Sequence, residues 1–413
     1  MTARVRTAAG EARSADFGGG TAPTGRTIIG LDIARFLAAL GVVVYHYAFF
    51  SWHEPAGATG LRAAIGSPVA YPGLLPLSWW GWVGVEIFFV ISGLVICLSA
   101  ENRSSAAFLR SRILRIAPAL WFFATISLVV TFLYSSATIE AVLPMYLRSI
   151  VLFPKGPWVD GVYWTLTVEV VFYGLICLLI LSGWITRLQA IVFSASMLVF
   201  GFYIAVLVAR ARPELGFAGP VLAAADAYVS RLLLLTTGAY FLVGANLYLL
   251  SRDGWSASGA VALAASLGAG AVGLWLSAEN NAAVLLHARS PATPVLIWLV
   301  VVGGLGLSLV FHRSGQSSPG LRNLARSAGL ASYPLYLFHN IGGAFLFGLL
   351  IAFGIGAYPA LLLAIALCVA VSVGFATWIE PALRRELGRR LARSPNLLRA
   401  EFSTSAVKRW DRT

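Results

Sequence analysis

The sequence of 413 residues has few charged residues and few cysteines, and each shortage excludes a class of protein. Charged residues make up 11% of the chain and hydrophobic residues 59%. With a mean hydropathy of +0.81, this composition excludes an ordinary soluble domain. The three cysteines, Cys97, Cys177 and Cys368, lie in apolar runs without paired spacing. This spacing excludes a disulfide framework or a cysteine zinc site, and we expect no metal.

Long apolar runs are what the sequence has in abundance. Ten of them, each near the roughly 20 residues needed to cross a bilayer, cover residues 29–50, 80–100, 117–135, 163–182, 190–209, 230–251, 257–277, 293–312, 330–354 and 357–379. They are too continuous for barrel strands of roughly ten alternating residues, and backbone groups in lipid must be satisfied internally. The sequence therefore predicts an all-α, polytopic membrane protein with about ten transmembrane helices.

The net charge of +13 is distributed unevenly along the chain. The tails and even-numbered loops between the predicted helices carry about 22 Lys and Arg residues, and the odd-numbered loops carry about 6. Because Lys and Arg accumulate on the cytoplasmic side of membrane proteins, we predict that both termini are cytoplasmic and that the protein lies in the cell (inner) membrane. The charge thus reflects topology in a lipid bilayer, and we expect no nucleic-acid partner.

The chain divides into three parts. Residues 1–28 are small, polar and Gly-rich without the apolar core of a signal peptide, which predicts a disordered cytoplasmic segment. Residues 29–380 are predicted to form one transmembrane domain. Residues 381–413 are predicted to form a basic cytoplasmic tail, whose stretch RRELGRRLARSPNLLR is either solvated or bound to anionic headgroups.

A charge inside a predicted span needs either a partner or a function, and three of the ionisable residues within the spans form one group. His46 in GVVVYHYAFF, Glu86 in GWVGVEIFFVISGLVI and Glu169 in WTLTVEVVFYGL are predicted at similar depth near the outer side. Such an arrangement suits a base with an orienting carboxylate. A histidine that only bridges two helices, or glutamates that only pair with Arg35 or His46, would give the same pattern.

Further polar residues lie outside this group, at the ends of predicted helices or, for His339, within the run 330–354. Arg112 and Arg115 in FLRSRILRIAPALWF are helical neighbours at the inner face. They form either a guanidinium pair suited to phosphate or a positive-inside anchor. His339 in SYPLYLFHN is either a binding or a packing residue, and Glu380 either lies at the interface or pairs with one of these arginines. Three histidines are predicted to be solvated and receive no role, namely His53, His287 and His312.

Six motifs between roughly residues 30 and 381 are similar, in this order, to those of the integral-membrane acyltransferase 3 family: GLDIARFLAALGVVVYH, GWVGVEIFFVISGLVI, RILRIAP, WTLTVEVVFY, SYPLYLFH and IEP. Each motif alone is weak, whereas the series on about ten helices is specific. The sequence departs from the family twice. Glu86 stands where the family often has Asp, and Val170 and Val171 stand where it often has a second Glu and a Gln.

The resemblance implies an enzyme that takes an acyl group, commonly acetyl, from acetyl-CoA or another acyl-CoA on the cytoplasmic side. The acceptor in the family is a hydroxyl, usually on a saccharide of a surface or exported glycan. The matching residues imply that Arg112 and Arg115, together with Arg35, bind the phosphates of the donor.

The resemblance also implies roles inside the bundle. His46 would take the proton from the acceptor hydroxyl, and Glu169, or Glu86, would orient it. We assign three further residues to substrate binding: Tyr173, Trp164 and His339.

Other interpretations remain open. Within the family, the acceptor can also be a secondary metabolite such as a macrolide. Polar residues in a helical bundle can also mark the path of a transporter or flippase, and a noncatalytic scaffold for glycan export would not need His46. The sequence indicates neither the acyl-chain length nor whether the protein is a homo-oligomer. It also does not distinguish direct transfer to the acceptor from a relay through an acyl-histidine.

Overall fold

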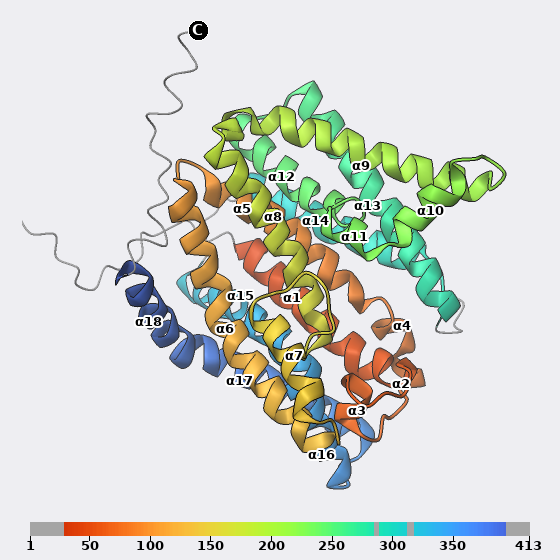
Figure 1. Cartoon of the computed structure of the whole chain (residues 1–413), viewed down its shortest axis with the longest axis vertical. Coiled ribbons are helices and arrows are strands. Elements are labelled where there is room, and N and C mark those ends of the chain that lie inside the picture. The colour runs from red at the N-terminus through yellow and green to blue at the C-terminus, as the bar shows by residue number, and fades with distance from the viewer. Residues whose placement is uncertain (1–28, 285–288, 312–317, 394–413) are drawn as a thin grey trace, which may run out of the picture.

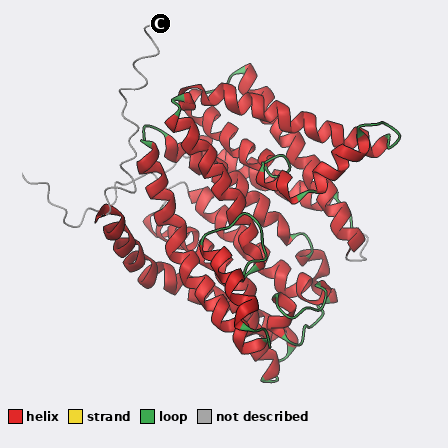
Figure 2. Cartoon of the chain, viewed as in Figure 1, coloured by secondary structure: helices red, strands yellow, loops and turns green. Residues whose placement is uncertain are grey.

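A computed structural model describes residues 29–284, 289–311 and 318–393. These residues form helices joined by loops, and no β-strand occurs among them (Figure 2). The α-helices are α1 Ile29–Tyr45, α2 Ser51–His53, α3 Leu61–Ile65, α4 Leu75–Ser78, α5 Gly84–Ala100, α6 Ser105–Tyr134, α7 Ile139–Ile150, α8 Trp164–Leu181, α9 Leu188–Ala211, α10 Ala218–Asp226, α11 Tyr228–Leu232, α12 Gly238–Asp253, α13 Ala257–Val284, α14 Ala292–Phe311, α15 Pro319–Phe338, α16 Ala344–Ala352, α17 Ala357–Gly374 and α18 Glu380–Arg393. The 3₁₀ segments are η2 Pro72–Leu74, η3 Gly81–Val83, η4 Gly161–Tyr163 and η5 Trp184–Arg187, and the π segments are η1 His46–Phe50, η6 His339–Gly343 and η7 Phe375–Ile379.

Within the described residues, nine continuous helices are long and apolar enough to cross a membrane. This confirms the predicted all-α, polytopic fold. The predicted run 230–251 is the exception, because it divides between α11 and the 16-residue α12. At 1.5 Å per residue, α12 is about 24 Å long, whereas the hydrocarbon core is about 30 Å thick. The cytoplasmic placement of the termini remains a prediction.

Small residues allow α5 and α12 to pack with their backbones in contact. A Cβ atom at Gly93 would overlap the carbonyl of Phe241, and one at Gly244 would overlap the carbonyl of Val90. Glycine is the residue that permits such an approach in a membrane bundle. The contact fixes α5, which carries Glu86 towards one end and Ser92 in its middle.

Two helices at the centre of the bundle, α1 and α15, lie side by side (Figure 1). Each passes into a π segment at a histidine, α1 at His46 and α15 at His339. The hydroxyl of Tyr47 donates to the carbonyl of His339 over 2.6 Å and ties the two segments together. Because π segments are rare and often occur at functional sites, they direct attention to these two residues.

The helix of the last span continues past residue 380, and the division there between a transmembrane domain and a tail remains a prediction. From α17 the helix continues through η7 into α18, which lies beside α6 at the edge of the bundle (Figure 1). Glu380 forms an ion pair with Arg384 at 2.5 Å, rather than with Arg112 or Arg115. The predicted N-terminal segment 1–28 and the tail beyond Arg393 lie outside the described residues.

Candidate active site

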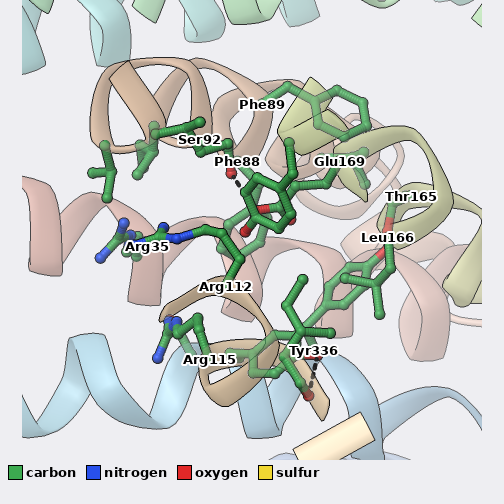
Figure 3. Close-up of a pocket in the computed structure, with 18 residues that line it drawn as sticks. Arg35, Phe88, Phe89, Ser92, Arg112, Arg115, Thr165, Leu166, Glu169 and Tyr336 are labelled. Atoms are coloured by element: carbon green, nitrogen blue, oxygen red, sulfur yellow. Dashed lines mark hydrogen bonds between the residues drawn. The ribbon is translucent and has the colours of Figure 1, made fainter. Parts of the chain in front are cut away.

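The residues predicted to bind phosphate line one cavity of about 100 Å³. We name it the arginine cavity and define it by Arg35 of α1, Arg112 and Arg115 of α6, and Ser92, Glu169, Tyr173 and Tyr333 around them. In Figure 3 the nitrogen ends of the three arginine side chains lie towards one side of the cavity, and Thr165 and Leu166 lie at the opposite side. Residues separated by more than a hundred positions thus meet at one place.

Aromatic rings hold the guanidinium groups of α6. The Arg112 guanidinium carbon lies 5.7 Å from the ring centres of both Phe108 and Tyr173, and that of Arg115 lies 5.5 Å from the ring centre of Tyr333. Neither arginine forms an ion pair with a carboxylate of the described residues. Since a guanidinium carries five N–H donors in a planar fork, both retain donors for an anionic ligand.

One carboxylate, Glu169, also lines the arginine cavity. Its Oε1 atom accepts hydrogen bonds from Ser92 Oγ at 3.1 Å and from the Tyr173 hydroxyl at 2.6 Å. Arg35 Nη1 lies 3.9 Å from Asp32 Oδ1 on the preceding turn of α1. With three arginines and one glutamate lining it, the cavity favours a ligand with several negative charges.

A second cavity of about 720 Å³ lies on the other side of a shared wall. We name it the histidine cavity, and its lining includes His46, Glu86, Trp164, Arg231 and Asn340. Val85 and Tyr336 line both cavities and form the wall between them. The Glu86 Oε2 atom is buried and has no hydrogen-bond partner among the described residues, so it remains available to a ligand in this cavity.

His46 is paired with a second histidine rather than with a carboxylate. Its Nδ1 atom lies 2.9 Å from Nε2 of His339, whose side chain is fully buried. Among the hydrogen bonds of the described residues, none joins His46 to Glu169 or Glu86. The prediction grouped the three at similar depth. The structure places Glu169 in the arginine cavity, and it places His339, which we assigned to the substrate, against His46.

The hydrogen bonds around this pair define its tautomers. His339 Nδ1 lies 2.8 Å from the Tyr336 carbonyl and 3.2 Å from the Leu335 carbonyl, and a carbonyl oxygen can only accept. The proton of a neutral His339 is therefore on Nδ1, and its Nε2 lone pair accepts from His46 Nδ1. Nε2 of His46 is left unprotonated, as a general base requires.

Asn340 and Asp160 form a polar pair beside the histidines, which the sequence analysis did not single out. Asn340 lines the histidine cavity, and its Nδ2 donates to Asp160 Oδ1 over 2.7 Å. The same oxygen accepts from the Val162 backbone N–H at 3.1 Å. Asp160 is fully buried in the loop before η4, and burial raises its pKa to about 7. The one feature of the sequence that pointed to this polar pair was the position of Asn340 directly after His339.

The remaining predicted residues fall in different places. Trp164 lines the histidine cavity, whereas Tyr173 lines the arginine cavity. His53, predicted in a loop and solvated, ends α2, is half-buried and donates from Nδ1 to the Phe49 carbonyl at 2.9 Å. Two other histidines lie outside the residues whose side chains the structure describes, His287 and His312.

Spanning helices surround a pair of histidines, one half-buried and one fully buried, and a cationic cavity, so the protein is embedded in a membrane and has side chains of the kinds that catalyse group transfer. A family model described as an acyltransferase domain matches residues 28–379. Because the match covers most of the chain, the protein belongs to the acyltransferase 3 family and is a multi-pass membrane acyltransferase. Searches of the curated proteins and of the solved structures found no match.

Proposed function

We propose that the protein is an acyl-CoA-dependent O-acyltransferase of the cell (inner) membrane. It would move an acyl group, with acetyl as the expected one, from cytoplasmic acyl-CoA to a hydroxyl of a saccharide destined for an exported or surface glycan. The observation that carries the proposal is the shared wall, Val85 and Tyr336, between a cationic cavity and the cavity of the histidine pair. A donor held on one side can thus present its acyl group to a base on the other.

The arginine cavity is the proposed donor site. Coenzyme A carries phosphate groups at one end and its thioester at the end of an extended arm, so it requires cations at a distance from the catalytic base. Arg35, Arg112 and Arg115 would bind the phosphates through paired N–H donors. We propose that Glu169 fixes Tyr173 and Ser92 through its two hydrogen bonds and has no direct role at His46.

The histidine pair is the proposed catalytic base. His46 Nε2 would take the proton of the acceptor hydroxyl while its oxygen attacks the thioester carbonyl carbon. The carbon–sulfur bond then breaks, and His46 returns the proton to the leaving sulfur. His339 would keep Nδ1 of His46 protonated and the ring oriented throughout.

Two further groups of the histidine cavity would act on the reactants. The Asn340 amide donates one N–H to Asp160. Its second N–H would stabilise the negative charge that develops on the thioester carbonyl oxygen during attack. The unpartnered Glu86 oxygen would accept a hydrogen bond from a hydroxyl of the acceptor. With cytoplasmic termini, the arginine cavity faces inward and the histidine cavity outward, so the acyl group would cross the bilayer.

The test is free-thiol release from acetyl-CoA by the purified protein, with saccharide extracts of the cell as acceptors. His46→Ala should lower turnover by roughly 10²-fold to 10⁴-fold, while coenzyme A binding is retained. His53→Ala is the matched control, because His53 belongs to the same span but lines neither cavity. If wild type neither binds coenzyme A nor releases thiol, the proposal fails and transport becomes the function to test. Thiol release with macrolides alone would instead assign a secondary-metabolite acceptor.

A further inference from the structure

A third cavity of about 400 Å³ adjoins the histidine cavity. We name it the aromatic cavity, and its lining includes Trp158, Trp164, Tyr228, Arg231 and Met145. Trp164 and Arg231 line the histidine cavity as well, as do Gly60 and Gly161. The two cavities therefore adjoin at these four residues, and a ligand with one end near His46 can extend towards the aromatic cavity.

The rings of the aromatic cavity are held in place by hydrogen bonds. The Trp158 indole N–H donates to the Phe153 carbonyl at 3.0 Å, and the Tyr228 hydroxyl lies 3.2 Å from Thr167 Oγ1. The Trp158 and Tyr228 ring centres are 6.3 Å apart. Rigid aromatic faces with polar edges suit the apolar faces and hydroxyls of a sugar ring.

Arg231 gives this cavity a single sign of charge. It is the one charged side chain among the residues that line the aromatic cavity, it is exposed, and its guanidinium carbon lies 5.4 Å from the Trp164 ring centre. It forms no ion pair with any carboxylate in the described part of the chain. An arginine is always ionised, so Arg231 is a charged group without a direct ion pair among these residues, and an anionic group of a ligand can supply one.

The neighbouring histidine cavity has the opposite tendency. Three carboxylates line it, those of Glu54, Glu86 and Asp226, together with Arg210, which is paired with Glu279, and Arg231 itself. A negative group on a ligand would be attracted by Arg231, where the two cavities adjoin, and would face an excess of carboxylates elsewhere in the histidine cavity. The two linings together would orient a ligand with its neutral hydroxyl end near His46 and an anionic end near Arg231.

We infer that the acceptor is an acidic saccharide, whose carboxylate or phosphate group binds Arg231 while a sugar ring packs between Trp158 and Trp164. The inference rests on the proposed function for the role of acceptor, but the binding site itself can be tested separately. The shared chemistry is an anionic group on a sugar. Either a uronic acid or a sugar phosphate supplies it.

The experiment measures binding of three probes by tryptophan fluorescence of the purified full chain: methyl glucoside, methyl glucuronoside and glucose 1-phosphate. We expect at least one acidic probe to bind roughly tenfold more tightly than the neutral probe. Arg231→Gln should abolish this preference, and Arg231→Lys should retain part of it. Comparison of the two acidic probes assigns the carboxylate or the phosphate.

Arg210→Gln is the matched control and should keep the preference. Arg210 also lines the histidine cavity, but it is already paired with Glu279 at 3.0 Å. Equal binding of all probes, no binding of either acidic probe, or a preference that survives Arg231→Gln would overturn the inference. Thiol release from acetyl-CoA, measured on the same samples, separates the outcomes. Arg231-dependent binding without thiol release would keep the anion site and reject acyl transfer.

Discussion

The arginine cavity and the histidine cavity differ in size, charge and the way their polar groups are satisfied. The first is about 100 Å³ and has three arginines, two of them held by aromatic rings and the third 3.9 Å from a carboxylate oxygen of Asp32. The second is about 720 Å³ and places a pair of hydrogen-bonded histidines beside an unpartnered carboxylate oxygen. In the proposed function, charge recognition and proton transfer take place on opposite sides of one wall. The wall keeps Arg35, Arg112 and Arg115 in a cavity that His46 does not line.

Removal of His339 should have the largest effect within this comparison. His339→Ala deletes the acceptor of the His46 Nδ1 proton and releases the imidazole to other tautomers and orientations. We expect kcat for acyl transfer to fall by roughly 10-fold to 100-fold, with KM for the donor nearly unchanged. The pH–rate profile should shift as well, because His46, the proposed base, has lost the hydrogen bond to His339. Equal losses in kcat and donor binding would assign His339 a structural role only.

Removal of a guanidinium from the arginine cavity should give the opposite pattern. Arg115→Ala or Arg112→Ala deletes charged donors to a phosphate, each worth about 1.5–3 kcal/mol, so coenzyme A affinity should fall by roughly 10-fold to 100-fold. Calorimetric titration of coenzyme A checks this. Arg110→Ala is the control, since Arg110 is on the same helix but donates to the Gly388 carbonyl at 3.1 Å and does not line the cavity. If Arg110→Ala lowers coenzyme A affinity equally, the loss comes from the reduced net charge of the protein and not from a phosphate contact in the arginine cavity.

The sequence was sufficient for the fold because a bilayer requires apolar runs of near-constant length. The turn that divides the apolar run 230–251 into α11 and α12 gave no comparable signal. Convergence of Arg112 and Arg115 with Arg35 was also predictable, because the family resemblance and the charge pattern pointed the same way.

The partner of His46 was not predictable from the sequence. The rise along a helix gives depth, and by depth alone Glu86 and Glu169 were equal candidates. Which side chain faces His46 depends on how helices rotate and pack, and both histidines begin π segments that alter this rotation. Asp160 was missed for a related reason, because a loop aspartate gives no sign in the sequence of being buried against Asn340.

A smaller effect is expected from the wall itself. Val85→Ala should remove side-chain atoms from the wall between the two cavities and raise turnover of butyryl-CoA relative to acetyl-CoA, by roughly threefold to tenfold. Thiol release with the two donors measures the ratio. Val95→Ala is the matched control, because Val95 lines only the arginine cavity. If both variants change the ratio equally, acyl-chain length is not selected at the wall.

The smallest effect on activity and the clearest pH dependence are expected at Asp160. Its pKa of about 7 in the folded protein exceeds the ordinary value of about 3.9. The protonated, neutral form therefore stabilises the fold, and this stability is lost as pH rises from about 4 to about 7, by at most roughly 1.4 kcal/mol per pH unit. Asp160→Asn keeps an oxygen that can accept from Asn340 but cannot ionise, so it should be less sensitive to pH.

Thermal unfolding of both proteins in detergent between pH 5 and 8 checks this expectation. The melting temperature of Asp160→Asn minus that of wild type should increase by a few degrees as pH rises. This difference should stop increasing above about pH 7. A difference that decreases with rising pH would mean that the carboxylate form is the stable one. Asn340 would then be held by an ionised partner, and a charge would stabilise this side of the histidine cavity, whereas aromatic rings hold Arg112 and Arg115 in the arginine cavity.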